Sequence, residues 1–409
     1  MLEGAEGQAT ALAMRLLVGV GEAAGAEALL DVASAHIDGG LYHGRASLDF
    51  AERMAGLGAR VRVPTTLNVG SLDLLHPERF RGDPATARAA RELMDRHVEM
   101  GCRPTWTCAP YQVAEVRPAL GQHVAWGESN AIVFVNSVLG ARTDRYGDFL
   151  DLCAAVAGRA PAAGLHLDGN RLGRRVFRLD GVSEDLLDQD VLYPVLGHLV
   201  GTRTGPSVPV IEGLPRALSE DRLKALGAAA ASSGSVGLFH AVGVTPEAET
   251  LDQALGGKPP EAIERVGPSD LRAARDQLST VTDGRIGAVS LGTPHASLGE
   301  LERLSAIVGG RRVAPGVEAF VATGRDVLSQ AQGRGWVEVI ERAGFRILTD
   351  TCTYVTPVIQ SPGPVMTDSA KWAYYAPGNL GVPVVFGSIE ECVRSAASGR
   401  VEREDGLWD

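Results

Sequence analysis

The sequence predicts an α/β protein made of several subdomains with parallel sheets. Its 409 residues are too many for one simple core. Short β-branched runs are each followed by a turn rich in Gly, Ser, Pro or Thr, and then by a helical pattern. This alternation of strand and helix is typical of parallel sheets. It recurs at residues 59–70, 163–170, 209–213, 235–243, 285–304, 317–331 and 382–396.

Helix-start signals support this interpretation because they follow the strand-like runs directly. Ser297 with Glu300 and Ser388 with Glu391 have the spacing of a capping box. Asp83 followed by Pro84 predicts an N-cap with proline at the first helical position. In "TDSAKWAYYAPG" (367–378) we expect Ser369 to cap a helix that Pro377 ends.

Composition narrows the class of partner. The net charge of −11 argues against nucleic acid and anionic membranes as partners, because both bind proteins through basic patches. No apolar run approaches the roughly 20 residues of a membrane span, and the first residues lack a basic signal-peptide region. Five scattered cysteines do not form a disulfide framework, so we expect a cytoplasmic protein with reduced thiols. Residues 1–400 are predicted to form the catalytic region, and the acidic segment 401–409 a frayed tail.

Polar clusters mark the predicted strand ends, where ligands bind in folds of this class. Their number exceeds what folding alone requires. They occupy residues 34–44, 64–70, 105–112, 127–130, 292–297 and 350–357.

Two of the five cysteines are predicted to bind a metal. Cys108 and Cys352 each follow a strand-like run, between threonines and close to Pro and Tyr. Two thiolates on separate loops could meet over one site and hold iron or zinc. Cys153 and Cys392 lie instead on apolar helix faces, which predicts core positions, and Cys102 is interpreted as structural.

Three histidines lie in the polar clusters, and each could bind substrate or transfer a proton near neutral pH. His36 and His43 flank "IDGGLY", and His295 follows a proline at a turn that enters a helix. The alternative for each is a hydrogen-bonded structural histidine, and it carries most weight for His43.

Further candidates are polar groups suited to an anionic substrate. Arg142 could clamp a carboxylate, or form a surface salt bridge. Ser369 and Lys371 could bind an anion at a helix start, or belong to a capped surface helix. The remaining substrate-binding candidates are Ser34, Thr66, Asn68, Glu128, Ser129, Asn130 and Thr143.

With these residues in view, the chain resembles the large subunit of aconitase X, a branch of the aconitase superfamily. Seven segments match that family in order along almost the whole chain, which is far more specific than any single match. They are "SAHIDGGLYHG", "VPTTLNVGSLDLLHP", "TCAPYQ", "GESNAIVFVNSVLGARTDRYGD", "GTPHASLGEL", "DTCTYV" and "TDSAKWAYYAPG".

The resemblance implies an iron-dependent hydro-lyase with three α/β subdomains around a central site. It implies iron on Cys108 and Cys352, and a substrate anion held by Arg142, Ser369 and Lys371. It also implies a separate small subunit that supplies the mobile swivel domain, which we expect to be absent from this chain. In the superfamily the proton-abstracting base is a serine of that domain; otherwise His36 or His295 is the first candidate.

The resemblance leaves the substrate and the metal centre open. Bacterial relatives typically dehydrate cis-3-hydroxy-L-proline, and archaeal relatives dehydrate mevalonate 5-phosphate; the few basic residues in the matched segments favour the amino acid. Some members have cysteine where this chain has Thr293. A [2Fe–2S] cluster or mononuclear iron is therefore favoured over a [4Fe–4S] cluster. A metal-free small-molecule-binding protein is the alternative from another functional class.

Overall fold

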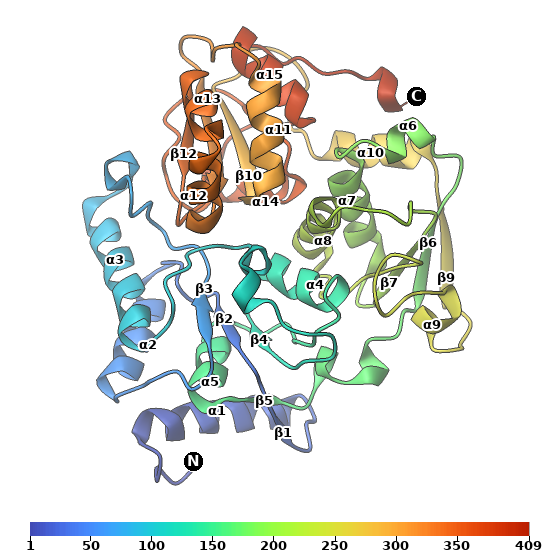
Figure 1. Cartoon of the computed structure of the whole chain (residues 1–409). Coiled ribbons are helices and arrows are strands. Elements are labelled where there is room, and N and C mark those ends of the chain that lie inside the picture. Colours follow the sequence, from blue (N-terminus) through green and yellow to red (C-terminus); the bar gives the residue numbers. More distant parts are fainter. Residues whose placement is uncertain (409) are drawn as a thin grey trace.

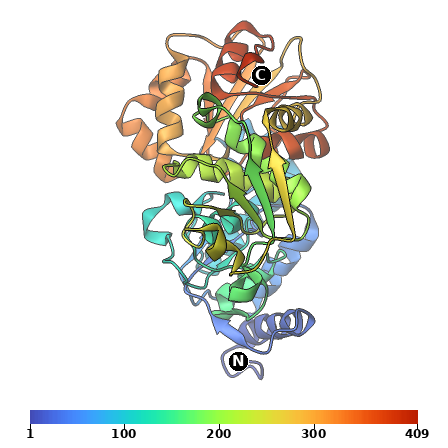
Figure 2. The same cartoon turned by 90° about the vertical axis from the view of Figure 1, so that its right-hand side faces the viewer.

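The computed structural model describes residues 1–408 and confirms the predicted α/β class. Three parallel sheets form three subdomains, each with helices packed around its sheet. In Figure 1 the first subdomain lies at the lower left, the second at the right and the third at the top. Figure 2 shows the third subdomain above the first, with the N-terminus at the far lower end.

The first subdomain contains a parallel sheet in the order β3-β2-β4 and a small antiparallel pair, β1-β5. Strand β2 is central, so its carboxyl end lies between those of β3 and β4. The elements are α1 (Gln8–Ala23), β1 (Leu29–Asp31), β2 (Ala35–Ile37), α2 (Arg45–Gly56), β3 (Thr65–Leu67), α3 (Pro84–Glu99), β4 (Ala125–Trp126), α4 (Ser129–Ser137), α5 (Leu150–Ala157) and β5 (Arg159–Pro161).

The second subdomain has the sheet order β8-β7-β6-β9. Helices α7 and α8 pack closely, because a Cβ on Gly197 would lie 2.1 Å from the Leu226 carbonyl oxygen. The elements are β6 (Arg175–Leu179), α6 (Glu184–Leu187), α7 (Leu192–Thr204), β7 (Pro209–Glu212), α8 (Glu220–Gly234), β8 (His240–Ala241), α9 (Leu251–Leu255), β9 (Ala262–Val266) and α10 (Pro268–Gln277).

The third subdomain has a five-stranded parallel sheet in the order β12-β11-β10-β13-β14. The chain proceeds from β10 to one side and from β13 to the other, so the strand order reverses between these neighbours. Such a switch point opens a crevice at the carboxyl ends of the strands. The elements are β10 (Ala288–Ala296), α11 (Leu298–Val308), β11 (Glu318–Thr323), α12 (Arg325–Gly333), α13 (Trp336–Arg342), β12 (Phe345–Leu348), β13 (Val365–Thr367), α14 (Ala370–Leu380), β14 (Val384–Phe386) and α15 (Ile389–Ser398).

The predicted N-terminal caps of three helices are confirmed. Ser297 and Ser388 each form a capping box, with Glu300 and Glu391 respectively. The Asp83 side chain accepts a hydrogen bond from the Thr86 N–H at the start of α3. These caps fix where helices leave the sheets, and so where the site loops begin.

Three local predictions were wrong. Residues 163–170 form two 3₁₀ turns rather than a strand, because the turn formers Gly164 and Asp168–Asn170 interrupt the short apolar run. Pro377 lies inside α14, which continues to Leu380 and is followed by the C-cap Gly381 in the left-handed region.

The third error concerns the C-terminal segment, which packs against the second subdomain. Trp408 is buried, with the Arg275 guanidinium over its ring, and Arg275 also pairs with Asp405. Burial of the indole and its contact with the Arg275 cation stabilise this packed position. The prediction of a frayed tail was therefore wrong. Asp409 lies outside the described residues.

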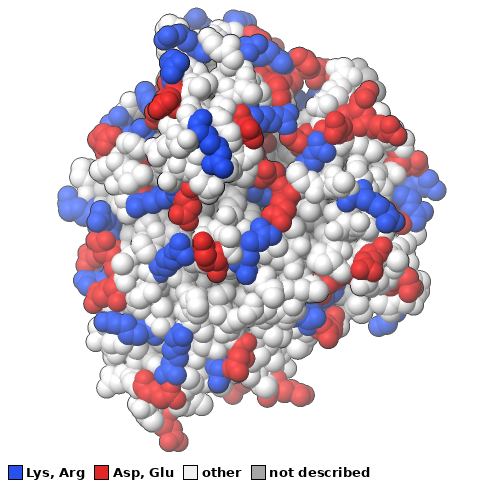
Figure 3. Space-filling model, in the orientation of Figure 1, with Lys and Arg blue, Asp and Glu red and all other residues white. Residues whose placement is uncertain are grey.

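The described surface carries both signs of charge. On the face in Figure 3, Lys and Arg side chains are interspersed with Asp and Glu. Within residues 1–408, no helix combines the length and apolar character needed to cross a bilayer.

Candidate functional site

Cys108, His295 and Cys352 meet at the junction of the first and third subdomains. Their ligand atoms all lie within 4.8 Å of one another, and all three side chains are buried. The two thiols come from loops 244 residues apart in sequence, and His295 comes from β10. The predicted meeting of Cys108 and Cys352 is therefore seen in the structure, although no named strand directly precedes Cys108.

Unusual backbone conformations precede both cysteines. Trp106 and Asp350, each two residues before a cysteine, have φ of 42° and 63°. A bulky residue in this region is strained, and such strain persists only where the surroundings hold it. Asp350 is held by the Arg325 guanidinium, with N–O distances of 2.6 and 2.7 Å, and its carbonyl accepts from the Gly70 N–H.

His295 is fixed by hydrogen bonds on both ring nitrogens. Its Nε2 lies 3.1 Å from the Thr351 carbonyl oxygen, which can only accept, so Nε2 carries the proton in the neutral ring. Nδ1 then keeps its lone pair, 3.1 Å from the Thr107 hydroxyl. Burial lowers the pKa of His295 to about 4, so the ring is neutral and able to coordinate a metal.

The surroundings favour one thiolate in the cysteine pair. Burial opposes ionisation, but the hydrogen bond from Cys352, the nearby Lys371 charge and the His295 backbone N–H together lower the pKa of Cys108. The His295 N–H lies 3.2 Å from the Cys108 Sγ. The same hydrogen bond, together with burial, raises the pKa of Cys352. Thiolates bind iron, so this donor set fits an iron centre.

A buried polar network adjoins the pair. The Lys371 Nζ lies 2.5 Å from Glu128 Oε1 and 3.2 Å from the Ser129 hydroxyl. Glu128 caps α4 by accepting from the Ala131 N–H. Asn130 donates to the Cys108 carbonyl at 2.6 Å. The predicted residues Glu128, Ser129 and Asn130 are thereby joined to Lys371 beside the cysteines.

The alternative interpretation of α14 as a surface helix was wrong. Ser369 caps the helix by accepting from the Trp372 N–H at 3.0 Å, as expected. However, Ser369 and Lys371 are only 7% and 3% exposed. Burying an ammonium is costly unless it is paired, which explains why Lys371 reaches Glu128 in another subdomain.

A second polar group lies at the carboxyl ends of β2 and β3. The Nδ1 of His36 is 2.8 Å from the Thr66 hydroxyl, and Asn68 donates to Asp38. Burial lowers the pKa of His36 to about 3. Burial and then the charges of Glu128 and other acids raise the pKa of Asp38 to about 8.

The other sequence candidates are placed elsewhere. Arg142 pairs with Asp168 and donates to the His166 carbonyl, so its guanidinium is engaged within the first subdomain. Thr143 accepts from the Trp126 N–H. His43 is exposed, and Ser34 is half-buried with its carbonyl bonded to the Ala125 N–H.

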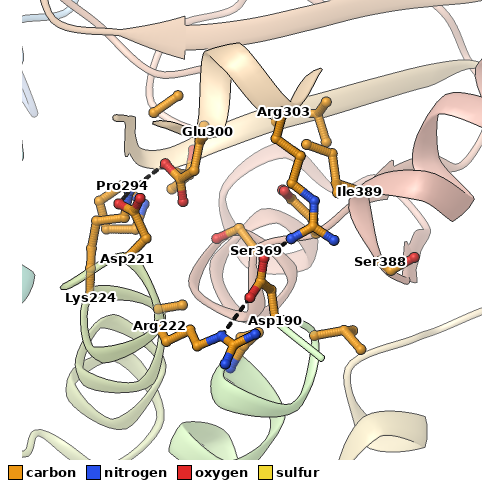
Figure 4. Close-up of a pocket in the computed structure, with 18 of the residues that line it drawn as sticks. Asp190, Asp221, Arg222, Lys224, Pro294, Glu300, Arg303, Ser369, Ser388 and Ile389 are labelled. Atoms are coloured by element: carbon orange, nitrogen blue, oxygen red, sulfur yellow. Dashed lines mark hydrogen bonds and ion pairs between the residues drawn. The ribbon is translucent and has the colours of Figure 1, made fainter. Parts of the chain in front are cut away.

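A cavity of about 170 Å³ lies between the second and third subdomains, at the switch point between β10 and β13. Thr293 and Pro294 line it from β10, and Ser369 and Lys371 line it from the start of α14. Ion pairs cross it: Lys224 bonds Glu300, and Asp190 lies between Arg222 and Arg303 (Figure 4).

Sequence reasoning missed several groups at these sites. Asp38 lies two residues after His36 and Asp368 directly precedes Ser369, both within polar motifs of the sequence, and this position was the signal that could have found them. Lys224, Asp221 and Glu300 could not be grouped, because the pairing of α8 with α11 depends on how two subdomains pack.

Family models match three consecutive segments, and each segment contains one of the three parallel sheets. They are the aconitase X first domain (residues 1–169), second domain (173–276) and third domain (286–398). This chain belongs to the aconitase X family.

Individual aconitase X relatives support the assignment. A protein of Pseudomonas aeruginosa named cis-3-hydroxy-L-proline dehydratase is 43% identical over 98% of this chain and 69% of its own length. The protein of the same name from Hypocrea jecorina is 41% identical over 97% of this chain and 67% of its own length. The phosphomevalonate dehydratase large subunit of Methanothermobacter thermautotrophicus is 38% identical over 96% of both chains.

The crystal structure of Thermococcus kodakaraensis aconitase X in its holo-form confirms the aconitase X fold. It aligns with a TM-score of 0.86 at 32% identity, over 97% of both chains.

Proposed function

We propose that this chain is the large subunit of an iron-dependent dehydratase that acts on cis-3-hydroxy-L-proline. The observation that carries the proposal is the buried pair Cys108 and Cys352, with His295. Lys371, whose charge acts on Cys108, lines the cavity between subdomains and so connects it to this cluster. The relatives named for that substrate, at 43% and 41% identity, support the choice of substrate.

The residues present fit an iron centre. Cys108 and Cys352 would hold it as thiolates. The Nδ1 of His295, which carries the lone pair, could bind it in place of the hydrogen bond from the Thr107 hydroxyl. Iron bound there would act as a Lewis acid on the leaving hydroxyl. A [2Fe–2S] cluster or a single iron agrees with two thiolates better than a cluster that needs three.

The chain itself would bind and orient the substrate in the cavity. The cavity is well below the roughly 300–1,000 Å³ of pockets for drug-sized ligands, so it suits a small molecule. The first backbone N–H groups of α14, at Ala370 and Lys371, lack partners within the helix and would receive the carboxylate. Fixing the ring in this way brings the reacting carbons to one place.

Dehydration breaks the C2–H and C3–O bonds and forms the C2=C3 double bond. The resulting enamine tautomerises to pyrroline-2-carboxylate. We propose that the base comes from a small swivel-domain subunit. The naming of the archaeal relatives as large subunits supports this. His36 and His295 are poor bases at neutral pH, because burial lowers the pKa of both.

Mevalonate 5-phosphate is the second candidate substrate. It is favoured by one observation: this chain and the phosphomevalonate dehydratase large subunit match over 96% of both lengths. Both candidates are small molecules with a carboxylate, so they differ in the second charged group: an ammonium in the amino acid and a phosphate in mevalonate 5-phosphate.

The test is co-expression with a small subunit under anaerobic conditions, followed by dehydration assays on both substrates. We expect pyrroline-2-carboxylate from cis-3-hydroxy-L-proline, and little product from the chain alone, since loss of a positioned base costs roughly 10²–10⁴-fold. Turnover of mevalonate 5-phosphate but not of cis-3-hydroxy-L-proline would refute the proposed substrate. A protein that holds no iron and dehydrates neither compound would instead be a metal-free binding protein.

A further inference from the structure

The charges in the cavity between subdomains are almost all paired. Lys224 bonds Asp221 and Glu300, and Arg303 bonds Asp190 and Glu390. Arg222 also pairs with Asp190, and Lys371 pairs with Glu128 outside the cavity. Each basic side chain that lines the cavity therefore already has a carboxylate partner.

Asp368 is the exception. It lines the cavity directly after β13, and no ion pair within residues 1–408 includes it. Its acidic neighbours create a negative electrostatic potential at this position. Burial and then the charge of Glu300 raise the pKa of Asp368 to about 7, with a further contribution from Glu390. A cation entering the cavity would relieve this repulsion, whereas a second anion would increase it.

A second unpaired group lies on the neighbouring strand. The Thr293 hydroxyl lines the cavity from β10, and its side chain is only 7% exposed. Within the described residues it has no hydrogen-bond partner. A buried hydroxyl without a partner is costly, so it indicates a position where a ligand completes the bond. Strands β10 and β13 are paired, which places Thr293 and Asp368 at the same edge of the sheet.

We propose that Asp368 recognises the secondary ammonium of the substrate, and that Thr293 hydrogen-bonds a polar group of the same molecule. This inference rests on the proposed function and makes Asp368 the residue that selects an amino acid. The start of α14 takes the carboxylate, and the adjacent Asp368 takes the cationic nitrogen. A zwitterion matches both, whereas a substrate with two anionic ends places one of them near an unpaired carboxylate.

The test compares two ligands that cannot be dehydrated because they lack the 3-hydroxyl. L-Proline carries the ring ammonium, and tetrahydrofuran-2-carboxylate has a ring oxygen in its place. Calorimetric titration uses the iron-loaded enzyme prepared for the dehydration assay. The variants are Asp368→Asn and, as the matched control, Glu390→Gln, because Glu390 lines the same cavity but already pairs with Arg303.

We expect the parent to prefer L-proline, and Asp368→Asn to weaken L-proline binding by about 10–100-fold, as for loss of a charge-assisted hydrogen bond. Binding of tetrahydrofuran-2-carboxylate should not weaken, and Glu390→Gln should keep the preference. Equal weakening of both ligands, or a parent without preference for the amine, would overturn the inference.

A measurement on the parent alone covers the case in which Asp368→Asn does not fold. Affinity for L-proline should rise between about pH 6 and pH 8 as Asp368 ionises, while that for the oxygen analogue should not. The other charged groups that line the cavity with Asp368 are already paired; they are Asp190, Asp221, Arg222, Lys224, Glu300, Arg303, Glu390 and Lys371. Burial and then the charge of Asp368 raise the pKa of the nearby Cys392 thiol, so it stays neutral in this range.

The pH profile and the dehydration assay separate the two failures. A profile equally flat for both ligands would overturn the inference. If the enzyme dehydrates cis-3-hydroxy-L-proline without preferring the amine, the inference fails and the function stands. Turnover of mevalonate 5-phosphate without L-proline binding overturns both.

Discussion

The Lys371 ammonium lies 2.5 Å from the Glu128 carboxylate, across 243 residues of sequence and between two subdomains. Both side chains are almost fully buried, at 3% and 5% exposure. The pair joins the helix start that lines the cavity to the loop network around Cys108. It therefore connects the region where we propose substrate binding with the region where we propose iron binding.

Breaking this pair should destabilise the protein strongly. Lys371→Met or Glu128→Gln leaves a buried group without its partner, at a cost of about 3–5 kcal/mol, and the double variant should recover part of the loss. Urea denaturation measures the coupling. Arg45→Ala removes an exposed ion pair with Asp49, which solvent screens, and should cost far less stability than either buried variant. Strictly additive losses in the two buried single variants would contradict the direct pairing.

Removing the cap of α14 should affect both stability and turnover. Ser369→Ala should cost about 1 kcal/mol, because the Trp372 N–H loses its acceptor. The kcat/KM should also fall, since the cap holds the proposed carboxylate site in place. Asp83→Ala removes the α3 cap, which does not line the cavity, and should change stability alone. Equal kcat/KM in the two variants would show that the start of α14 does not contact substrate.

Asp38 should make stability depend on pH. Its pKa is raised to about 8 in the folded protein, against about 3.9 when unfolded. Between these values the folded state binds a proton that the unfolded state does not, so Asp38 lowers stability as pH rises from about 4 to 8. Asp38→Asn removes this dependence, and its Tm relative to the parent should increase from pH 5 to pH 8. Parallel Tm profiles for both proteins would contradict the raised pKa.

The α/β class and the helix starts could be predicted because their signals are local. The capping pair of Ser297 and Glu300 needs only the spacing of two residues within one turn. Cys108 and Cys352 stood out through their polar surroundings. All five cysteines are buried, so burial alone would not have selected them.

Other features depend on contacts that no local pattern encodes. The partner of Lys371 and the packed position of Trp408 follow from the docking of subdomains. The cavity arises where the strand order reverses between β10 and β13, and a sequence does not reveal strand order. Pro377 was expected to end a helix that in fact continues to Leu380.

The most direct test of the account measures iron content and cis-3-hydroxy-L-proline dehydration on the same anaerobic preparations of three variants. Cys108→Ser and Cys352→Ser should each lose most of the iron and the activity, because a thiolate ligand is removed. Cys392→Ser should keep both at a modest cost in stability, since Cys392 lies in the core of the third subdomain. Iron and activity retained equally in all three variants would contradict a metal centre on Cys108 and Cys352.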